Sequence, residues 1–466
     1  MQRVAIRASP GSYSALGALY ARQNELGCAI AAFEEALRLE PGFTEARYNL
    51  ALALMEKRDR KRAVHELRKA IREKPDHFLA HNSLGLALEG LGDLEAAAEE
   101  FKTALSINPQ FAFAAFNLSK VLDRQNRHTA SIFYLRQALT ASPPKELAYE
   151  IQLALAVAHA RSGNYAEAIG LFRKLIASQS DSSELRFNLG SAYAHHQQYQ
   201  EASEAYKEAL RLDPGKDAAL LALAKALLML SQFEAALPHL HDYARRKPRE
   251  AEGYELLGEA YKRLGRFTEA EEALQHALQL NPNSYDAHYN LGSVLQHSGK
   301  IDRAILELRE AKLLKPDLPE VHYELGLALA KRKQEEEAKK ELEVFQKLRH
   351  ENQRQIEAGN LNNQANRLLD EGNPAAAAEA YKKALSLAPN NAEWHYNLSL
   401  SYSKLGDLPG QREHLEKAVQ INPNMAQAQN QLGLLYMAGG RIADAEKAFK
   451  TAIAISPQYA EAKSNL

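Results

Sequence analysis

Prolines recur along this chain at a fixed step of 34 residues, and this period constrains the fold more than any other feature. They fall into three runs: Pro41, Pro75, Pro109 and Pro143; Pro214, Pro248, Pro282 and Pro316; Pro389, Pro423 and Pro457. A fixed period of this length is typical of one small unit stacked many times. Because each unit packs only on its neighbours, a chain of 466 residues needs no large central core.

Within each period the apolar and small residues keep the same spacing. One unit carries Leu84, Gly85, Leu88, Ala97, Phe101, Ala104 and Pro109, and a later unit carries Leu257, Gly258, Tyr261, Ala270, Leu274, Ala277 and Pro282. Steps of three and four residues place side chains on one face of a helix. Turn residues such as Gly92-Asp93 separate two such helices, and Asn281-Pro282 ends the second one. We therefore expect an all-α fold made of helix pairs.

This pattern resembles the tetratricopeptide repeat family over nearly the whole chain, with repeats similar to those of O-GlcNAc transferase and of bacterial repeat scaffolds. The resemblance implies a right-handed α-solenoid superhelix of thirteen helix pairs, whose first helices line the concave wall. The expected segments are an extension at 1–9, repeats 1–4 at 10–145, repeats 5–10 at 149–352, repeats 11–13 at 358–459, and the start of an incomplete fourteenth repeat at 460–466.

The tenth unit departs from the common pattern. Residues 334–356 read as one extended second helix, with oppositely charged side chains such as Glu335 and Lys339 spaced four apart. We expect this helix to be a stiff, solvated spacer. It would separate a segment of ten repeats from a module of three.

The composition excludes several broad classes of protein. The 58 basic residues almost balance the 59 acidic ones, which disfavours a general binder of nucleic acids or membrane surfaces. No apolar stretch reaches the roughly 20 residues that span a bilayer, and no targeting segment is recognisable, so the default expectation is a cytoplasmic location. Cys28 is the only cysteine, so neither an internal disulfide nor a cysteine-based zinc site can form.

The sequence offers no pattern typical of catalysis or of cofactor binding. Four histidines, His81, His288, His322 and His395, share one position of the repeat. Successive repeats spread such side chains along the array, so packing explains them better than metal binding does. No phosphate-binding glycine loop and no nucleophile elbow occurs. We expect neither an enzyme nor a bound metal or cofactor.

The family geometry implies that particular repeat positions face a ligand on the concave wall. Asparagine occupies the sixth position in Asn49, Asn117, Asn188, Asn290, Asn363 and Asn397. A row of amides can both donate to and accept from the backbone of an extended peptide. The alternative is that asparagine merely belongs to the repeat consensus.

Three further sets complete the expected binding face. In the last module Asn363, Asn397 and Gln431 follow one another every 34 residues, flanked by Asn362, Asn366, Tyr396, Asn430 and Leu434. An acidic band is expected from Glu252, Glu255 and Glu259, which would suit a basic ligand unless it is simply a solvated helix face. Aromatic residues recur at the fifth position, in Tyr48, Phe116, Phe187, Tyr289, Tyr323 and Tyr396, and suggest anchor sites for a peptide.

Three functions follow from this reading. The first is a scaffold or adaptor that binds protein segments in its groove, with no nucleic acid among its expected partners. The second is the recognition arm of a longer enzyme, such as a glycosyltransferase. The third is an RNA-binding helical repeat. We also expect residues 460–466 to fray, leaving the stripe of Ala445, Phe449, Ala452 and Ile453 partly uncovered. On that expectation the chain is a fragment that self-associates weakly through its carboxyl-terminal end.

Overall fold

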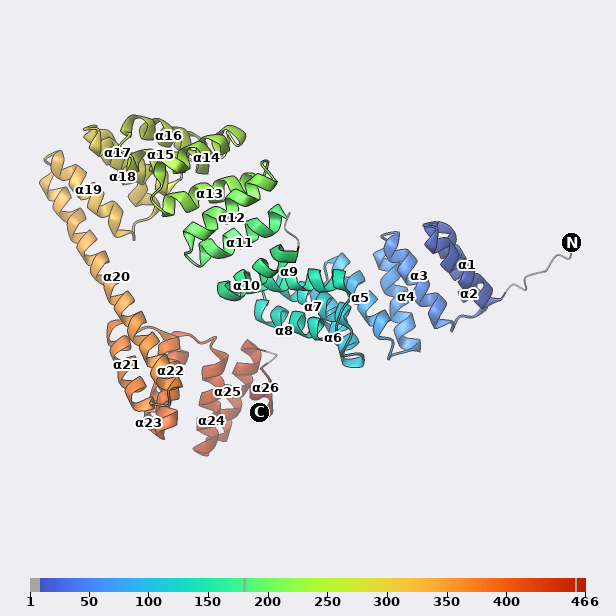
Figure 1. Cartoon of the computed structure of the whole chain (residues 1–466). Coiled ribbons are helices and arrows are strands. Elements are labelled where there is room, and N and C mark those ends of the chain that lie inside the picture. The colour runs from blue at the N-terminus through green and yellow to red at the C-terminus, as the bar shows by residue number, and fades with distance from the viewer. Residues whose placement is uncertain (1–8, 179–181, 457–458) are drawn as a thin grey trace. The chain divides into compact units, whose positions relative to one another are not determined.

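The structure is a computed structural model that describes residues 9–178, 182–456 and 459–466, and there it consists of helices joined by short turns (Figure 1). The chain divides into two compact units, Met1–Arg266 and Phe267–Leu466. Most of the extension expected at 1–9 lies outside the described residues. The all-α repeat fold predicted from the 34-residue period is confirmed.

The described part of the first unit contains fifteen helices, and consecutive helices within this unit pack on each other. They are α1 (Pro10–Arg22), α2 (Leu26–Leu39), α3 (Thr44–Glu56), α4 (Arg60–Glu73), α5 (Phe78–Leu91), α6 (Leu94–Ile107), α7 (Ala112–Arg124), α8 (His128–Thr140), α9 (Lys145–Arg161), α10 (Tyr165–Ser178), α11 (Ser183–His195), α12 (Tyr199–Leu212), α13 (Asp217–Met229), α14 (Phe233–Arg246) and α15 (Ala251–Arg263). The three residues inserted at 146–148 extend the beginning of α9.

The second unit contains the remaining described helices, which also pack in chain order. They are α16 (Phe267–Leu280), α17 (Tyr285–His297), α18 (Ile301–Leu314), α19 (Pro319–Lys331), α20 (Glu335–Asp370), α21 (Pro374–Leu387), α22 (Ala392–Leu405), α23 (Leu408–Ile421), α24 (Ala426–Ala438), α25 (Ile442–Ile455) and α26 (Ala460–Asn465). None of the helices in the described part of the chain is both long and apolar enough to cross a membrane.

Every turn between the two helices of a pair contains a residue in the left-handed conformation. Seven of these residues are glycines, such as Gly92 at φ 89°, and the others are Asn24, Arg58, Asn126, Gln197, Ser231 and Lys333. Glycine adopts this conformation without strain, whereas other residues pay about 1 kcal/mol. The same backbone turn therefore recurs whether or not the sequence supplies its preferred residue.

The core of each repeat is built around its twenty-fourth residue. In the first unit this residue is Phe33, Leu67, Phe101, Leu135, Phe172, Tyr206 or Leu240, and none is more than 3% exposed. A glycine on the first helix makes room for it: a Cβ added to Gly85 would lie 2.6 Å from the Phe101 ring. In this repeat the two helices approach closely because that glycine has no side chain, whereas other repeats have a small residue such as Ala51 or Ser119 at the same position.

Helix α20 runs without a break from Glu335 to Asp370. The long helix expected in the tenth repeat therefore does not end near Ile356 but continues as the first helix of the eleventh repeat. The insertion at 353–357 is helical and exposed along its length. Figure 1 shows α19 packed on the first half of α20 and α21 packed on its second half. One helix therefore serves two repeats.

The shared helix leaves the tenth repeat without the usual following helix against it. Leu342 is the twenty-fourth residue of this repeat and is half-exposed, whereas its counterpart Leu308 is fully buried. The eleventh repeat is correspondingly polar on the face that would normally meet its predecessor. It has exposed Asn360 and Gln364 where the twelfth and thirteenth repeats have Trp394 or Ala428 and Leu398 or Leu432. The sequences of both the tenth and the eleventh repeat thus reflect the missing packing between them.

Residues 460–465 form the helix α26 rather than fraying. Ala462 is fully buried, and the amide nitrogen Nδ2 of Asn465 donates to Oδ1 of Asn430 at 3.0 Å. Of the stripe that we expected to be partly uncovered, Ala445, Phe449 and Ala452 are 3%, 2% and 0% exposed, and Ile453 is half-buried. Tertiary contacts rather than helix propensity stabilise so short a helix.

Candidate functional site

We define the first-helix face as the fifth, sixth and ninth residues of each repeat, which lie on its first helix. The sixth-position asparagines lie on α3, α7, α11, α17, α20 and α22, and all are half-buried except the exposed Asn363. The two compact units each carry part of this face, so each part is described by itself.

In the first unit the fifth and sixth positions of successive repeats contact each other. Nδ2 of Asn117 donates to Oδ1 of Asn82 at 3.1 Å. The hydroxyls of Tyr48 and Ser83 lie 3.3 Å apart and are related by the same sequence separation of 35 residues. Part of the asparagine row therefore links one repeat to the next. One amide hydrogen of Asn117 is used in this contact.

A contact of the same kind in the second unit shows that the role predicted for one site residue is wrong. Asn430 occupies a fifth position and is only 1% exposed, because it bonds to Asn465 of the next helix and lies 3.5 Å from the Tyr459 hydroxyl. It cannot flank an open groove. Asn366 is also engaged, since its Oδ1 accepts from the Tyr381 hydroxyl at 2.5 Å. Both side chains stabilise the module instead of being free for a ligand.

Three predicted site residues of the last module do have free amides. The side chains of Asn363, Asn397 and Gln431 make no hydrogen bond with any described residue, and they come from α20, α22 and α24 in turn. Tyr396, beside Asn397, is half-buried, and burial raises the pKa of its hydroxyl. These three amides are the best candidates for contacting a peptide backbone.

The predicted acidic residues lie on α15 of the first unit. Glu252 is already paired, since Nζ of Lys225 donates to its carboxylate at 2.6 Å. Glu255 and Glu259 are half-buried and form no ion pair with a described residue. The acidic surface on this helix therefore consists of two unpaired carboxylates rather than three.

A cavity of about 350 Å³ opens beside Phe116 in the first unit, between α7 and α9. Its lining is Phe116, Ser119, Lys120, Asp123, Ser131, Glu150, Leu153, Ala154, Val157 and Arg161. The lining thus combines apolar side chains with charged groups, which suits one anchoring side chain of a peptide. The aromatic pattern indicated Phe116, but the charged lining was missed: Lys120 and Asp123 come from the same helix as Phe116, and Glu150 and Arg161 come from the next repeat.

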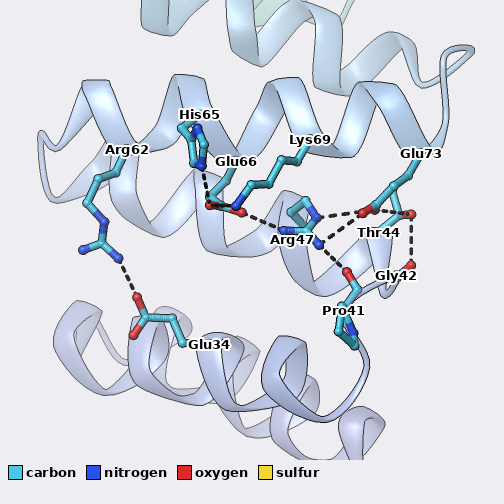
Figure 2. A network of polar contacts seen from close by, with 10 residues as sticks. All are labelled: Glu34, Pro41, Gly42, Thr44, Arg47, Arg62, His65, Glu66, Lys69 and Glu73. Carbon is cyan, nitrogen blue, oxygen red and sulfur yellow. Dashed lines mark hydrogen bonds and ion pairs between the residues drawn. The ribbon is translucent and has the colours of Figure 1, made fainter.

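A second set of polar contacts links the two helices of several repeats at the fourth residue of the repeat, and Figure 2 shows the example in the second repeat. The Arg47 guanidinium donates to Glu66 at 2.8 Å, contacts Glu73 at 3.1 Å and donates to the Pro41 carbonyl. Burial tends to raise the pKa of Glu66, but hydrogen bonds from Lys69 and Arg47 outweigh it and the pKa is lowered. We call this arrangement the inter-helix bridge.

Histidine replaces arginine in three other inter-helix bridges. The His81, His288 and His322 rings each contact a glutamate 19 residues later, at 2.7, 2.7 and 2.6 Å, and each meets the carbonyl of a proline six residues earlier. Carbonyl and carboxylate oxygens are both acceptors, so a ring with hydrogens on both nitrogens satisfies both. These histidines were predicted to be packing residues, and His81 and His322 are buried, but their hydrogen bonds to glutamate were not predicted.

The twelfth repeat differs, because His414 stands where the other bridges have glutamate. Nδ1 of His395 lies 2.9 Å from Nδ1 of His414, and Nε2 of His395 meets the Pro389 carbonyl at 3.0 Å. The carbonyl requires a hydrogen on Nε2, so Nδ1 of His395 accepts from Nδ1 of His414 when both rings are neutral. Burial lowers the pKa of both rings, in His414 to about 4.

No group of three or more side chains suited to hold a metal ion occurs among the described residues. None of the curated protein sequences compared with the chain matches it. Among solved structures, MamA is 28% identical over 35% of this chain and 95% of its own, with a TM-score of 0.33. The Cut9–Hcn1 complex is 17% identical over 98% and 96%, with a TM-score of 0.34.

A tetratricopeptide repeat protein from Parabacteroides merdae is 18% identical over 54% of this chain and 98% of its own, with a TM-score of 0.41. One tetratricopeptide repeat model matches residues 14–60, 48–112, 153–217, 221–284 and 362–426. Two further models of the same repeat match 263–323 and 412–466, and 114–145. These matches cover most of the chain, and the chain belongs to the tetratricopeptide repeat family.

Proposed function

We propose that this protein is an interaction scaffold whose last three repeats bind an extended peptide along the first-helix face. The observation that carries the proposal is the row of free amides of Asn363, Asn397 and Gln431, one from each repeat. An amide donates and accepts at once, so each repeat can bond to the backbone of an extended chain without reading its side chains.

The charge and chemistry of the chain support this function over the alternatives. The balanced net charge of −1 provides no electrostatic term for binding a nucleic-acid backbone. Repeat arrays present long surfaces on which many modest contacts add up. The Phe116 cavity of the first unit would hold a separate anchoring side chain, independent of the amide row.

The test uses peptides selected by phage display against the intact chain, followed by fluorescence anisotropy. Replacing Asn363 and Asn397 together by alanine removes two hydrogen bonds of about 1 kcal/mol each, so affinity should fall about 30-fold. Peptides N-methylated along the backbone should lose affinity for the wild-type chain, while the double variant should hardly distinguish them from unmodified peptides.

The matched control replaces Asn352 and Asn424, two exposed asparagines outside the row. This pair should bind like the wild type, and circular dichroism should show equal helicity in all three proteins. Unchanged affinity of the Asn363/Asn397 double variant would mean that asparagine only serves the repeat consensus, and the proposed groove would be abandoned.

A further inference from the structure

A cavity of about 620 Å³ lies over the contact between His395 and His414 in the second unit. It is lined by α21, α22 and α23 and by the turn before α22, through Lys382, Leu385, Ser386, Pro389, Asn390, His395, Leu398, His414, Lys417, Gln420 and Ile421. None of these residues belongs to the first-helix face, so the cavity is separate from the proposed peptide groove.

The cavity coincides with a missing carboxylate. In the other inter-helix bridges the fourth residue of the repeat meets a glutamate 19 residues later: Glu66, Glu100, Glu307 or Glu341. The equivalent residue of the twelfth repeat is His414, whose Nε2 has no hydrogen-bond partner among the described residues. The position that carries a negative charge elsewhere is therefore neutral here.

The charges around the cavity favour an anion over a metal cation. Lys382 and Lys417 line it, and each is paired with a glutamate on its own helix, Glu379 at 2.9 Å and Glu413 at 2.7 Å. All four side chains are about half exposed or more, and exposed pairs of this kind contribute roughly 0–1 kcal/mol. Both ammonium groups can therefore turn to an incoming anion, and both would repel a divalent cation.

We propose that this cavity binds a carboxylate next to an aliphatic group, as at the carboxyl-terminal end of a peptide that finishes in a leucine-like residue. The carboxylate lies between Nε2 of His414 and the lysine ammonium groups, where it replaces the glutamate of the other bridges. Ile421, which is 38% exposed, and the small exposed edge of Leu385 receive the aliphatic part. The site does not depend on the amide row, and each can fail without the other.

Binding is coupled to the uptake of a proton. Nδ1–H of His414 already points to His395, so a bond from His414 to a carboxylate requires a second hydrogen, on Nε2. The groups facing His414 are His395 and Tyr402 of α22, Lys382 of α21, and Glu413 and Lys417 of its own helix. Burial, His395 and the lysines lower its pKa to about 4, so the carboxylate binds more tightly as the pH falls towards that value.

The experiment follows the imidazole resonances of the intact chain by NMR after selective ¹⁵N labelling of histidine, with N-acetyl-leucine as the probe. The His414 resonance, identified by its loss in His414→Glu, should shift with the probe, and its pKa should rise by about one unit, which is a tenfold preference for the protonated ring. N-acetyl-leucinamide, which lacks the carboxylate, should cause no shift. Inorganic phosphate should cause a smaller shift, because it leaves the aliphatic surface empty.

Three variants decide between specific binding and a general charge effect. His414→Glu restores the bridge of the other repeats, so the remaining His395 resonance should not respond to the probe. Lys417→Gln should weaken binding several-fold. Lys450→Gln should not, although Lys450 pairs with Glu446 in the same four-residue spacing. Equal responses to the acid and the amide, a response that survives His414→Glu, or a response to Zn²⁺ but not to anions would each overturn the proposal.

Discussion

The ninth and tenth repeats are neighbours with almost the same inner architecture and different surroundings. Each has a glycine on its first helix, Gly292 or Gly326, facing a leucine on its second, Leu308 or Leu342. Each also has a His–Glu inter-helix bridge. In the ninth repeat α19 packs on α18, whereas α20 simply continues past the tenth. The comparison separates what a repeat contributes by itself from what its neighbour contributes.

The exposed fractions of equivalent side chains show how much burial the neighbouring repeat contributes. Leu308 and Ala311 are both fully buried in the ninth repeat. Their counterparts Leu342 and Phe345 are half-exposed, and Phe345 instead lies against Tyr323, with ring centroids 5.0 Å apart. The phenylalanine covers part of the surface that a following helix would otherwise bury. A repeat can thus keep its internal contacts while losing much of its burial.

The largest expected difference comes from truncating the two leucines. Leu308→Ala should destabilise its repeat by about 3 kcal/mol, because it empties a fully enclosed site, while Leu342→Ala should cost about 1 kcal/mol. Repeat arrays unfold in parts, so the measurement is hydrogen exchange of the peptides from α17–α18 and α19–α20 in the intact chain. Equal losses of protection would show that the tenth repeat is as enclosed as the ninth.

A smaller difference should follow from adding a methyl group to each glycine. A Cβ on Gly292 would lie 2.5 Å from Cγ of Leu308, which has nowhere to move, and we expect a net cost of about 1–2 kcal/mol. A Cβ on Gly326 would lie 2.9 Å from Leu342. That half-exposed side chain can rotate away, and alanine gains up to about 1 kcal/mol of helix propensity, so the net change should be near zero. Hydrogen exchange measured at increasing temperature gives the loss of stability for each substitution, and equal losses would contradict this prediction.

The smallest expected effect is the loss of stability of the tenth repeat at acidic pH. Burial raises the pKa of Glu341, but hydrogen bonds from Lys312 and His322 outweigh it and leave the pKa below the ordinary value. A carboxyl with a lowered pKa in the folded state adds stability at neutral pH that is lost as the pH falls through the folded value. Protection of α19–α20 should therefore decrease on acidification below about pH 4.5, and less so in Glu341→Gln. An identical acid profile in that variant would exclude Glu341 as the cause.

The repeat fold was largely predictable because its signals are local. Prolines, turn glycines and the leucine stripe each act within one helix pair, so the 34-residue period was enough. The end of the long helix was misjudged, because the helix was expected over 334–356 only, whereas it continues through the insertion at 353–357 to Asp370. Those five residues include neither proline nor glycine, and all are compatible with a helix. Gln364, which stands where the other repeats have leucine, could have indicated the loss of stacking.

The candidate site was less predictable because it depends on contacts between repeats. Asn117 and Asn397 occupy the same sixth position, yet Asn117 bonds to Asn82 of the neighbouring repeat and Asn397 has a free side chain. A position within one repeat does not reveal what the neighbouring repeat places against it. The bridges could have been found, however, since His81 and Glu100 share their separation of 19 residues with His288 and Glu307. At the same separation His395 is followed by His414 instead of a glutamate, so this interruption of the series could also have been found in the sequence.

The 36 residues of α20 determine the rotation of repeats 11–13 around the helix axis as well as the length of the helix. At about 1.5 Å per residue the helix is roughly 54 Å long, and each residue turns the chain by about 100° around the helix axis. Insertion of a single residue in the exposed stretch 351–357 would therefore swing repeats 11–13 about a quarter of a revolution around α20 while leaving every packed contact intact. Insertion of seven would return them to within about 20°. The number of residues in α20 therefore determines the direction in which repeats 11–13 face.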